Sequence, residues 1–303
     1  MTNIIAESEL ILNKDGSVYH LNLLPEEIAD TIITVGDPDR VGEVSKYFDR
    51  IEVKKAHREF VTHTGFIGNK KLSVLSTGIG TDNIDIVMNE LDALVNIDLK
   101  NRTIKNRLSS LNIIRIGTAG GLQDFLDVDS FVVSSGAFGM DGLLNHYQLV
   151  EGETEDEDNA LLDEWEDSFE RAFQFDNHVE PINETYYVDG DEILTGIFKN
   201  KEGFHSGLTV TCSGFYGPQG RSLRIKPYHT DFIEKLVSFR FEEEKILNFE
   251  METAGIYGLG KLLGHHCCSL SVIVANRVKQ KFSTNATHSV DKLITTVLET
   301  LAK

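Results

Sequence analysis

Short runs of β-branched and other apolar residues alternate with helical patterns along most of this chain, and three of these runs lead into polar segments. The segments are 36–40 (Gly-Asp-Pro-Asp-Arg), 115–121 (Arg-Ile-Gly-Thr-Ala-Gly-Gly) and 248–254 (Asn-Phe-Glu-Met-Glu-Thr-Ala). Strands that alternate with helices are typical of an α/β fold, in which ligands bind at the carboxyl ends of strands. We therefore predict an α/β fold with each segment just past the carboxyl end of a strand.

The apolar periodicity predicts where the elements lie. Strands are expected at 31–35, 51–56, 60–68, 72–76, 111–116, 131–135, 208–212, 246–249 and 270–274. Helices are expected at 38–48, 81–95 with Thr81 or Asp82 as N-cap, 161–173, 252–263 and 288–301. No linker or internal repeat divides the chain, so we expect one domain over residues 1–303, with extra material near 98–110 and 151–158.

The composition disfavours several classes of function. The formal net charge is −19, and such a field repels nucleic acid and anionic membranes, so any phosphate site must be a local group of Arg. No apolar run is long enough for a membrane-spanning helix, and the first residues lack the pattern of a signal peptide. The three cysteines do not form a disulfide framework, so we expect a cytoplasmic protein.

The run His-His-Cys-Cys at 265–268 invites a metal-site interpretation. These residues lead into the apolar run 270–274, which is typical of a buried strand. Adjacent residues of a strand point to opposite faces, so four consecutive side chains cannot converge on one ion. The pattern favours a structural strand here.

Two of the polar segments combine glycine with arginine, which suits an anion such as phosphate. Gly36 allows close approach of the backbone, and Arg40 lies one helical turn further on, although an ordinary Asp-Pro turn explains the same residues. Arg115 interrupts an apolar strand, where an unpaired cation is costly, so it requires a buried anion, either a carboxylate of the protein or a ligand. Thr118 and the glycines after it add a hydroxyl and exposed N–H groups.

The third segment offers two carboxylates that flank a methionine. Glu250 and Glu252 are favoured near a helix N-terminus by the helix dipole, or they accept hydrogen bonds from the hydroxyls of a sugar. His57-Arg58-Glu59 between two strands is compatible with a surface ion pair. A phosphate site together with a sugar site indicates an enzyme that cleaves a nucleoside with phosphate.

Eight pieces of the chain, in order from about Val18 to the C-terminus, resemble the nucleoside phosphorylase family that includes uridine phosphorylase. They are 18–21 (Val-Tyr-His-Leu), 36–41 (Gly-Asp-Pro-Asp-Arg-Val), 57–60 (His-Arg-Glu-Phe), 76–80 (Ser-Thr-Gly-Ile-Gly), 115–118 (Arg-Ile-Gly-Thr), 215–221 (Phe-Tyr-Gly-Pro-Gln-Gly-Arg), 249–252 (Phe-Glu-Met-Glu) and 274–277 (Val-Ala-Asn-Arg). The resemblance implies a single-domain, three-layer α/β/α fold with a mixed, partly barrel-like central sheet. It also implies a homo-oligomer, a dimer or a trimer of dimers, whose active sites are shared between subunits.

The resemblance also implies a role for each site residue. Phosphate would be bound by Gly36, Arg40, Arg115 and Thr118, with Arg58 from a neighbouring subunit. Ribose would be bound by Glu250, Met251 and Glu252, with His20 reaching the 5′-hydroxyl in a neighbour. The base would be bound by Gln219 and Arg221, with Phe215 stacking on it. The residues expected to act in catalysis are Arg221, Gln219, Arg115 and Glu250.

The implied reaction is the reversible phosphorolysis of a pyrimidine ribonucleoside, with uridine and phosphate giving uracil and ribose 1-phosphate. Arg221 would stabilise the charge that develops on the leaving base. Phosphate is a co-substrate, and no metal or organic cofactor is expected. Some relatives hold a monovalent cation near the residue that matches Glu59; because Asn83 replaces a Ser there, we do not predict that ion.

Several departures from the family pattern leave alternatives open. Ala119 removes a hydroxyl that relatives often have, and the order Gly217-Pro218 reverses the usual Pro-Gly. Purine nucleoside phosphorylases place an Asp after the late strand, where this chain reads Val-Ala-Asn-Arg at 274–277 and has no Asp, so a purine enzyme is the less favoured alternative. An inactive nucleoside-binding protein is a third. The choice between uridine and thymidine or deoxyuridine stays open, as does that between dimer and hexamer.

Overall fold

The computed structural model describes residues 4–148, 185–241 and 243–302, and contacts divide the chain into two compact units. The first unit comprises Met1–Ile116, Leu259–Cys267 and Val290–Lys303, and the second comprises Gly117–Gly258 and Cys268–Ser289. The acidic segment 151–158 and the helix expected at 161–173 lie outside the described residues. One domain over residues 1–303 stays a prediction.

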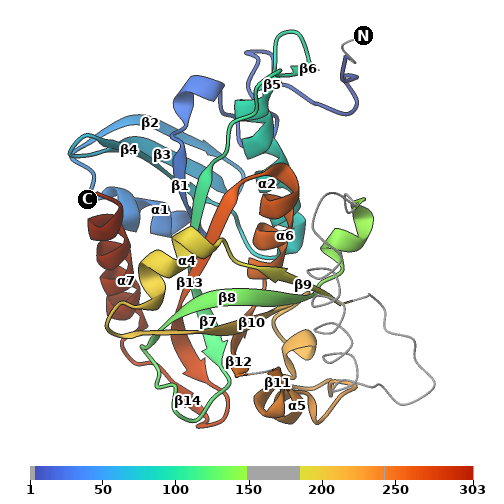
Figure 1. The fold of residues 1–303 in the computed structure, drawn as a ribbon, viewed down its shortest axis with the longest axis vertical. Helices are drawn as coiled ribbons and strands as arrows, with labels where there is room; N and C mark the ends of the chain where they lie inside the picture. Colours follow the sequence, from blue (N-terminus) through green and yellow to red (C-terminus); the bar gives the residue numbers. More distant parts are fainter. Residues whose placement is uncertain (1–3, 149–184, 242, 303) are drawn as a thin grey trace. The chain divides into compact units, whose positions relative to one another are not determined.

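A mixed sheet forms the centre of the first unit. Its strands run in the order β2 (Arg50–His57), β3 (Phe60–Ile67), β4 (Lys70–Ser76), β1 (Thr31–Val35) and β7 (Asn112–Gly121), of which β7 continues into the second unit. β1 is parallel to both β4 and β7, whereas β3 is antiparallel to β2 and β4. Every residue of β1 is buried, as its continuous apolar run requires of a central strand. The helix α1 (Pro38–Ser45) packs against β3 and β4 (Figure 1).

The helix α2 (Thr81–Asn96) buries the apolar face that the sequence predicts, with Ile84, Met88 and Leu91 among its buried residues. The expected cap by Thr81 or Asp82 is wrong. The residue before the helix is Gly80, which makes no side-chain cap and has a φ of 92°, a left-handed conformation that only glycine adopts readily. The short strands β5 (Ile97–Asp98) and β6 (Thr103–Ile104) pair within the connection that follows.

In the second unit the strands close into a ring. Its order is β12 (Glu244–Glu250), β10 (Phe204–Cys212), β8 (Phe131–Met140), β13 (His266–Asn276) and β7, which pairs with β12 again. The closing pair is antiparallel and joins Asn248 to Gly121 and Phe249 to Gly120. Such closure gives the barrel-like sheet that the resemblance implies.

Shorter elements surround this ring. The strands are β9 (Tyr186–Asp189), β11 (Arg240–Phe241) and β14 (Lys281–Phe282), which pair with β8, β12 and β13 respectively. The helices are α4 (Glu192–Lys199), α5 (Phe232–Ser238), the greater part of α6 (Thr253–Leu263) and the start of α7 (Ala286–Leu301). The 3-10 turns are η2 (Leu143–His146) and η3 (Gly217–Gln219), while η1 (Pro25–Glu27) belongs to the first unit.

The sequence places the end of β7 five residues too early. Residues 117–121 were expected to form a turn past the strand, but the strand continues to Gly121. A Cβ atom at Gly120 would lie 3.1 Å from the ring of Phe249, so glycine permits β12 to approach this closely. The glycines therefore serve the closure of the barrel-like sheet.

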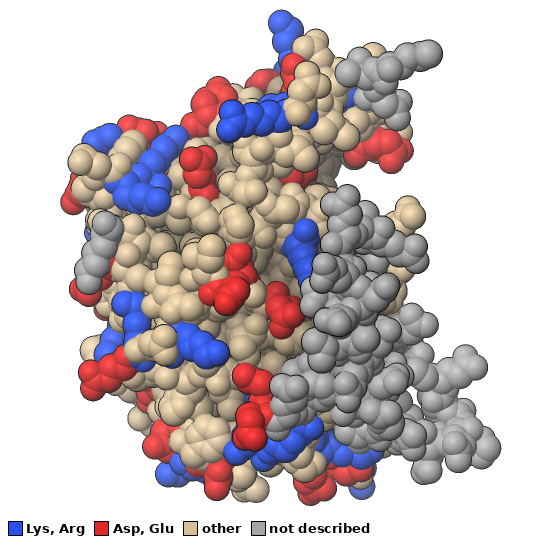
Figure 2. Space-filling model, in the orientation of Figure 1, with Lys and Arg blue, Asp and Glu red and all other residues tan. Residues whose placement is uncertain are grey.

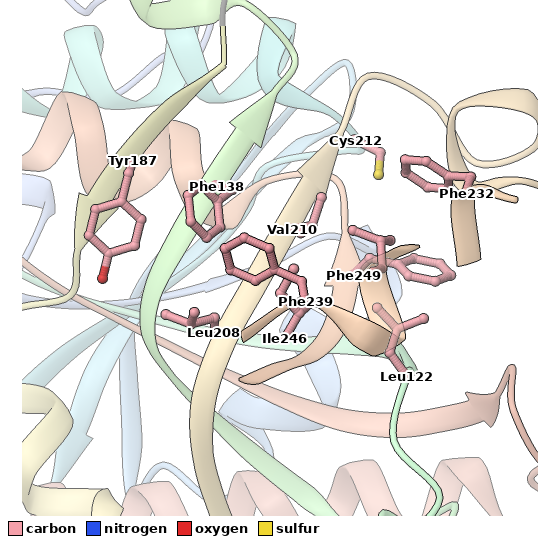
Figure 3. Packing of buried hydrophobic residues seen from close by; sticks show 11 residues of the cluster. Leu122, Phe138, Tyr187, Leu208, Val210, Cys212, Phe232, Phe239, Ile246 and Phe249 are labelled. Atoms are coloured by element: carbon pink, nitrogen blue, oxygen red, sulfur yellow. The ribbon is translucent and has the colours of Figure 1, made fainter. Parts of the chain in front are cut away.

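A hydrophobic cluster fills the second unit (Figure 3). The ring of Phe138 lies 5.0 Å from that of Tyr187 and packs edge-to-face on Phe239 at 5.5 Å. Phe249, which is fully buried, belongs to the same cluster. Burial of each such side chain contributes about 1.5–3 kcal/mol to stability. The cluster therefore holds Phe249 in a fixed position, and Arg221 and Arg277 lie over the ring of Phe249.

The strand interpretation of residues 265–268 is confirmed. His266, Cys267 and Cys268 lie in β13, and both cysteines are buried. His265 precedes the strand, and its buried ring accepts a hydrogen bond from the backbone N–H of Leu111 at 3.2 Å.

The surface drawn in Figure 2 carries acidic and basic side chains that are interspersed, without one large patch of either sign. None of the helices within the described residues is both long and apolar enough to cross a membrane.

Candidate functional site

Three residues expected to bind an anion come together in the first unit. Arg115 on β7 is paired with Thr34 on the parallel strand β1, so Gly36 and residue 117 follow at the same edge of the sheet. Arg40, in the first turn of α1, lies with its Nη1 atom 3.5 Å from the carbonyl oxygen of Ile116. Arg115 is only 7% exposed. Arg40 and Arg115 therefore bring two guanidinium groups to an edge where Gly36 has no side chain, and such an arrangement suits an oxyanion.

The sequence explains this arrangement locally. Asp37 caps α1 by accepting a hydrogen bond from the backbone N–H of Asp39 at 3.0 Å, and Pro38 occupies the first helical position. This cap fixes where the helix begins and thus where Arg40 points. Thr118 lies three residues after Arg115 on the same strand and belongs to the second unit, with a half-buried side chain.

His20 and Arg58 lie together in the first unit, in what we call the His20 patch (Tyr19, His20, His57, Arg58 and Glu90). The ring of His57 bonds the carbonyl oxygen of His20 at 2.9 Å, and the guanidinium of Arg58 lies 5.8 Å from the centre of the Tyr19 ring. Arg58 is exposed and adopts a positive φ of 54° in the tight turn between β2 and β3. Both residues that the resemblance assigns to a neighbouring subunit thus share one surface.

Glu90, on α2, orients His20 and was missed from the sequence. Its carboxylate accepts hydrogen bonds from the backbone N–H groups of His20 and Leu21 and lies 2.7 Å from Nδ1 of His20. A carboxylate at Nδ1 favours the tautomer with the proton on that nitrogen, so Nε2 becomes the acceptor. Such an acceptor suits a hydroxyl group as its partner.

The residues expected to read a base come together in the second unit. Gln219 is 2% exposed, and its Oε1 atom accepts a hydrogen bond from Nη1 of Arg221 at 2.5 Å. The same nitrogen donates to the carbonyl oxygen of Phe215, and the guanidinium lies 3.7 Å from the centre of the Phe215 ring. Gly220, with a φ of 63°, allows the chain to turn between Gln219 and Arg221.

Gln219 also connects this group to the carboxylate segment. Its Nε2 atom lies 3.5 Å from the carbonyl oxygen of Glu250, at the end of β12. The amide nitrogen of Gln219 therefore faces the segment Glu250-Met251-Glu252, whereas its oxygen faces Arg221.

The carboxylate of Glu250 is held by the protein itself. It accepts hydrogen bonds from the hydroxyl of Thr211 at 2.7 Å and from the backbone N–H groups of Glu252 and Thr253 at 2.9–3.0 Å. These bonds satisfy the first N–H groups of α6, which accounts for a carboxylate at this junction. Glu250 thereby fixes the backbone of Met251 and Glu252.

Arg277 completes the group and was missed among the expected site residues. Its guanidinium donates to the carbonyl oxygens of Gln219 at 3.0 Å and Gly220 at 3.3 Å. Arg221 and Arg277 both lie 5.7 Å from the centre of the Phe249 ring. The motif Val-Ala-Asn-Arg contains Arg277, but its role depends on carbonyl groups almost sixty residues away in the chain.

The two guanidinium groups affect one another. Burial and the nearby charge of Arg277 lower the pKa of Arg221 to about 10, and burial also lowers the pKa of Arg277. Among the described residues neither forms an ion pair with a carboxylate. This positive region therefore favours a ligand that carries or develops negative charge.

Asn276, next to Arg277, has a structural role. Its side-chain nitrogen donates to the carbonyl oxygens of Gln123 at 2.8 Å and Leu126 at 2.6 Å, and its oxygen accepts from the backbone of Lys279. Asn276 is 1% exposed. Its amide thus holds the loop after β7 in place.

Asp141, just past the end of β8, is a further acidic group of the second unit. It accepts hydrogen bonds from the hydroxyl of Tyr186 at 3.0 Å and the backbone N–H of Leu143 at 2.9 Å. Burial raises the pKa of Asp141, and the charge of Glu250 adds to this effect.

Comparison with known proteins gives a consistent result. The family model described as "Phosphorylase superfamily" matches residues 30–302. A uridine phosphorylase from Thermococcus kodakarensis is 25% identical over 287 residues, which cover 93% of this chain and 86% of that protein. A purine nucleoside phosphorylase of the DeoD type from Buchnera aphidicola is 24% identical over 265 residues, 86% of this chain and 89% of that protein.

A solved structure shares the fold. The crystal structure of a nucleoside phosphorylase from Trypanosoma brucei, which shows uridine phosphorylase activity, superposes with a TM-score of 0.83 and 29% identity. The match covers 96% of this chain and 99% of that one. The resemblance drawn from the sequence and the mixed α/β fold with a barrel-like sheet are both confirmed.

Proposed function

The chain belongs to the phosphorylase superfamily, and from this premise we propose that it catalyses the reversible phosphorolysis of uridine to uracil and ribose 1-phosphate. The observation that carries the proposal is the pair formed by Gln219 and Arg221. The enzyme is a pentosyltransferase in this account, as the uridine phosphorylases among its relatives are.

The pair presents hydrogen-bonding groups that match the edge of uracil. Gln219 Nε2 is a donor, Oε1 retains a second lone pair as an acceptor, and the guanidinium of Arg221 is a donor. Uracil presents the complementary series of O2, N3–H and O4. Cytosine offers an unprotonated N3 and an amino group, which leaves Oε1 without a donor and sets the amino group against Arg221. The pair therefore supports uracil over cytosine.

The same residues support departure of the base. When the bond between C1′ and N1 breaks, its electron pair moves into the ring and appears on the carbonyl oxygens. Arg221 donates to O4, and the charge of Arg277 stabilises the same anion. The proton that the phosphate gives up as it forms the ester reaches the base directly or through solvent, and the base leaves as neutral uracil.

Phosphate is the nucleophile that forms the new bond to C1′. We assign its binding to Gly36, Arg40, Arg115 and Thr118, with Arg58 supplied by a neighbouring subunit. Several Arg side chains orient the oxyanion while its charge stays available for attack. Phosphate is thus a co-substrate, and we propose no metal or organic cofactor.

Ribose is assigned to Glu250, Met251 and Glu252, of which Glu250 also holds the other two in position, and His20 of a neighbouring subunit is assigned to the 5′-hydroxyl. The His20 patch supports this assignment because it offers an exposed Arg and a His acceptor on one surface. We therefore propose a cytoplasmic homo-oligomer, a dimer or a trimer of dimers, of single-domain subunits that share active sites.

A purine nucleoside phosphorylase remains the second candidate because purine enzymes occur among the relatives. Asn276 argues against it, since its amide is engaged with backbone carbonyls where a purine enzyme places an Asp. A catalytically inactive nucleoside-binding protein is the third candidate.

Chromatography of the purified protein with uridine, thymidine or inosine, each with and without phosphate, tests the proposal. Uracil that appears from uridine only with phosphate supports it. Hypoxanthine released from inosine, with no uracil released from uridine, favours the purine enzyme. Release of base without phosphate indicates a hydrolase. Binding of nucleoside without turnover favours the inactive protein.

A further inference from the structure

A pocket of about 350 Å³ opens beside Arg221 in the second unit. Its walls are formed by residues from the stretch 216–227: Tyr216, Gly217, Arg221, Leu223, Arg224, Ile225, Lys226 and Pro227. Arg221 is therefore shared between the base-reading pair and this pocket. A base held by Gln219 and Arg221 has the pocket on its Arg221 side.

The charge of the pocket walls is entirely positive. Arg221, Arg224 and Lys226 are cationic, and none of the eight described residues that line it is acidic. The whole chain carries 48 acidic against 29 basic residues, so such a local excess is unusual in this molecule. Within the described part of the chain, neither Arg224 nor Lys226 forms a salt bridge. The walls therefore favour an anionic group.

The orientation of the base follows from Gln219. Its Nε2 atom lies beside the carbonyl oxygen of Glu250, next to the segment assigned to ribose. Ribose is attached to N1, whose neighbouring carbonyl is O2, so Nε2 pairs with O2 and Arg221 pairs with O4. O4 is carried by C4, whose neighbour in the ring on the side away from N3 is C5, and a substituent on C5 therefore extends past Arg221 toward the pocket.

We propose that this pocket receives the C5 substituent of a pyrimidine nucleoside and selects substituents that carry a carboxylate, through Arg224 and Lys226. This inference rests on the proposed function and adds a substrate class to it: uridine derivatives with an acidic group on C5.

The test compares two substrates of equal size that differ in charge, 5-(carboxymethyl)uridine and 5-(carbamoylmethyl)uridine. At pH 7 and low salt, we expect kcat/KM for the acid to exceed that for the amide by roughly five- to tenfold, because exposed ion pairs give modest gains. The preference should shrink as salt is added, since these charges are accessible to screening.

Two sets of variants show whether the pocket causes the preference. In the double variant Arg224→Gln/Lys226→Gln, the ratio of acid to amide should fall to about one. The matched control is Lys199→Gln, which removes one charge from an exposed position on α4 and should keep the ratio of the unmodified protein. A ratio near one in the unmodified protein, or a ratio unchanged in the double variant, overturns the inference.

Calorimetry of the free bases 5-(carboxymethyl)uracil and 5-(carbamoylmethyl)uracil separates this inference from the proposed function. Tighter binding of the acid that is lost in the double variant supports the pocket even where uridine is not cleaved. Cleavage of uridine with phosphate, together with equal binding of the two bases, overturns the pocket and leaves the proposed function standing.

Discussion

Two guanidinium groups that share one aromatic ring are the chief chemical feature at the scale of single residues. Arg221 and Arg277 both lie over Phe249, and Arg277 also ties down the backbone of Gln219. Burial of Arg221 and, second, the like charge of Arg277 both cost energy in the protein without a ligand, and together they lower the pKa of Arg221. An anionic leaving group relieves this cost, so the charge arrangement favours the transition state over the neutral substrate.

Replacement of Arg221 tests this role. The variant Arg221→Gln retains a donor but loses the charge, and we expect kcat for uridine to fall by about a hundred- to a thousandfold. Steady-state kinetics at saturating phosphate would measure it. The control is Arg107→Gln, an exposed position in the connection before β7, which should keep full activity. Equal activity of both variants would contradict the role given to Arg221.

The burial of Asp141 leads to a prediction of how the free energy of unfolding depends on pH. Burial raises the pKa of Asp141 in the folded protein, so its contribution to stability is fully present at low pH, where the group is protonated, and is lost as the pH rises through the folded pKa. Asn can replace it while it keeps the bonds to Leu143 and Tyr186. We therefore expect Asp141→Asn to gain stability relative to the unmodified protein as the pH rises from about 4 toward neutral.

Urea unfolding across this pH range would measure the effect. Asp127→Asn is the control with no expected pH dependence: a hydrogen bond from Lys279 lowers the pKa of Asp127, so its contribution to stability is fully present above about pH 4 and is lost only at lower pH. A difference between Asp141→Asn and the unmodified protein that does not change with pH would show that burial does not govern the Asp141 carboxyl.

At the scale of elements, the end of β12 and the start of α6 position the carboxylate segment. Thr211 on β10 and the first N–H groups of α6 hold Glu250, so a strand, a neighbouring strand and a helix are fixed at one point. The sequence predicted this junction because an apolar strand, two carboxylates and a helical pattern follow one another locally. It could not decide between a sugar ligand and a helix cap for Glu250, since that depends on Thr211 of another strand.

The glycines of the sheet show a second limit of the sequence. Residues 117–121 were expected to leave β7, because glycine disfavours strands, yet they continue it where β12 closes the ring. Similarly, Gly139 lies opposite Tyr186, and a Cβ atom there would overlap the ring of that tyrosine. Such requirements arise from partners that are distant in the chain.

Replacement by alanine should have opposite effects on stability at Gly139 in the sheet and at Gly196 in the helix α4. Gly139→Ala forces the buried Tyr186 ring aside, and we expect a loss of about 1–3 kcal/mol in the free energy of unfolding. Gly196→Ala on α4 meets no atom within 4 Å, and we expect a gain of about 0.5–1 kcal/mol because alanine favours helix. Urea unfolding measures both, and a Gly139→Ala protein as stable as the parent would contradict the packing described here.

At the scale of the whole molecule, the proposal requires more than one copy of the chain. His20 and Arg58 occupy one surface patch, and the family resemblance predicts that they serve a neighbour. The sequence predicted the fold because eight short motifs keep their order along the chain, and the roles of the residues in those motifs stay predictions. The contributions of Glu90 and Arg277 could not be predicted from the sequence, because each contacts backbone groups of a segment that is distant in the chain.

Mixed oligomers test whether sites are shared. The variants Arg58→Gln and Arg221→Gln should each be nearly inactive alone. Co-expression in equal amounts should restore about a quarter of the parental activity, since half of the dimers are then mixed and each has one intact site. Activity in the mixture no higher than the mean of the two variants would show that Arg58 acts within its own subunit.

The central claim is that phosphate, and not water, accepts the sugar. Phosphorus NMR of the protein with uridine and inorganic phosphate at pH 7 tests it most directly. We predict a ribose 1-phosphate resonance that grows in step with the release of uracil. Release of uracil with no sugar phosphate, or no consumption of uridine, would contradict it.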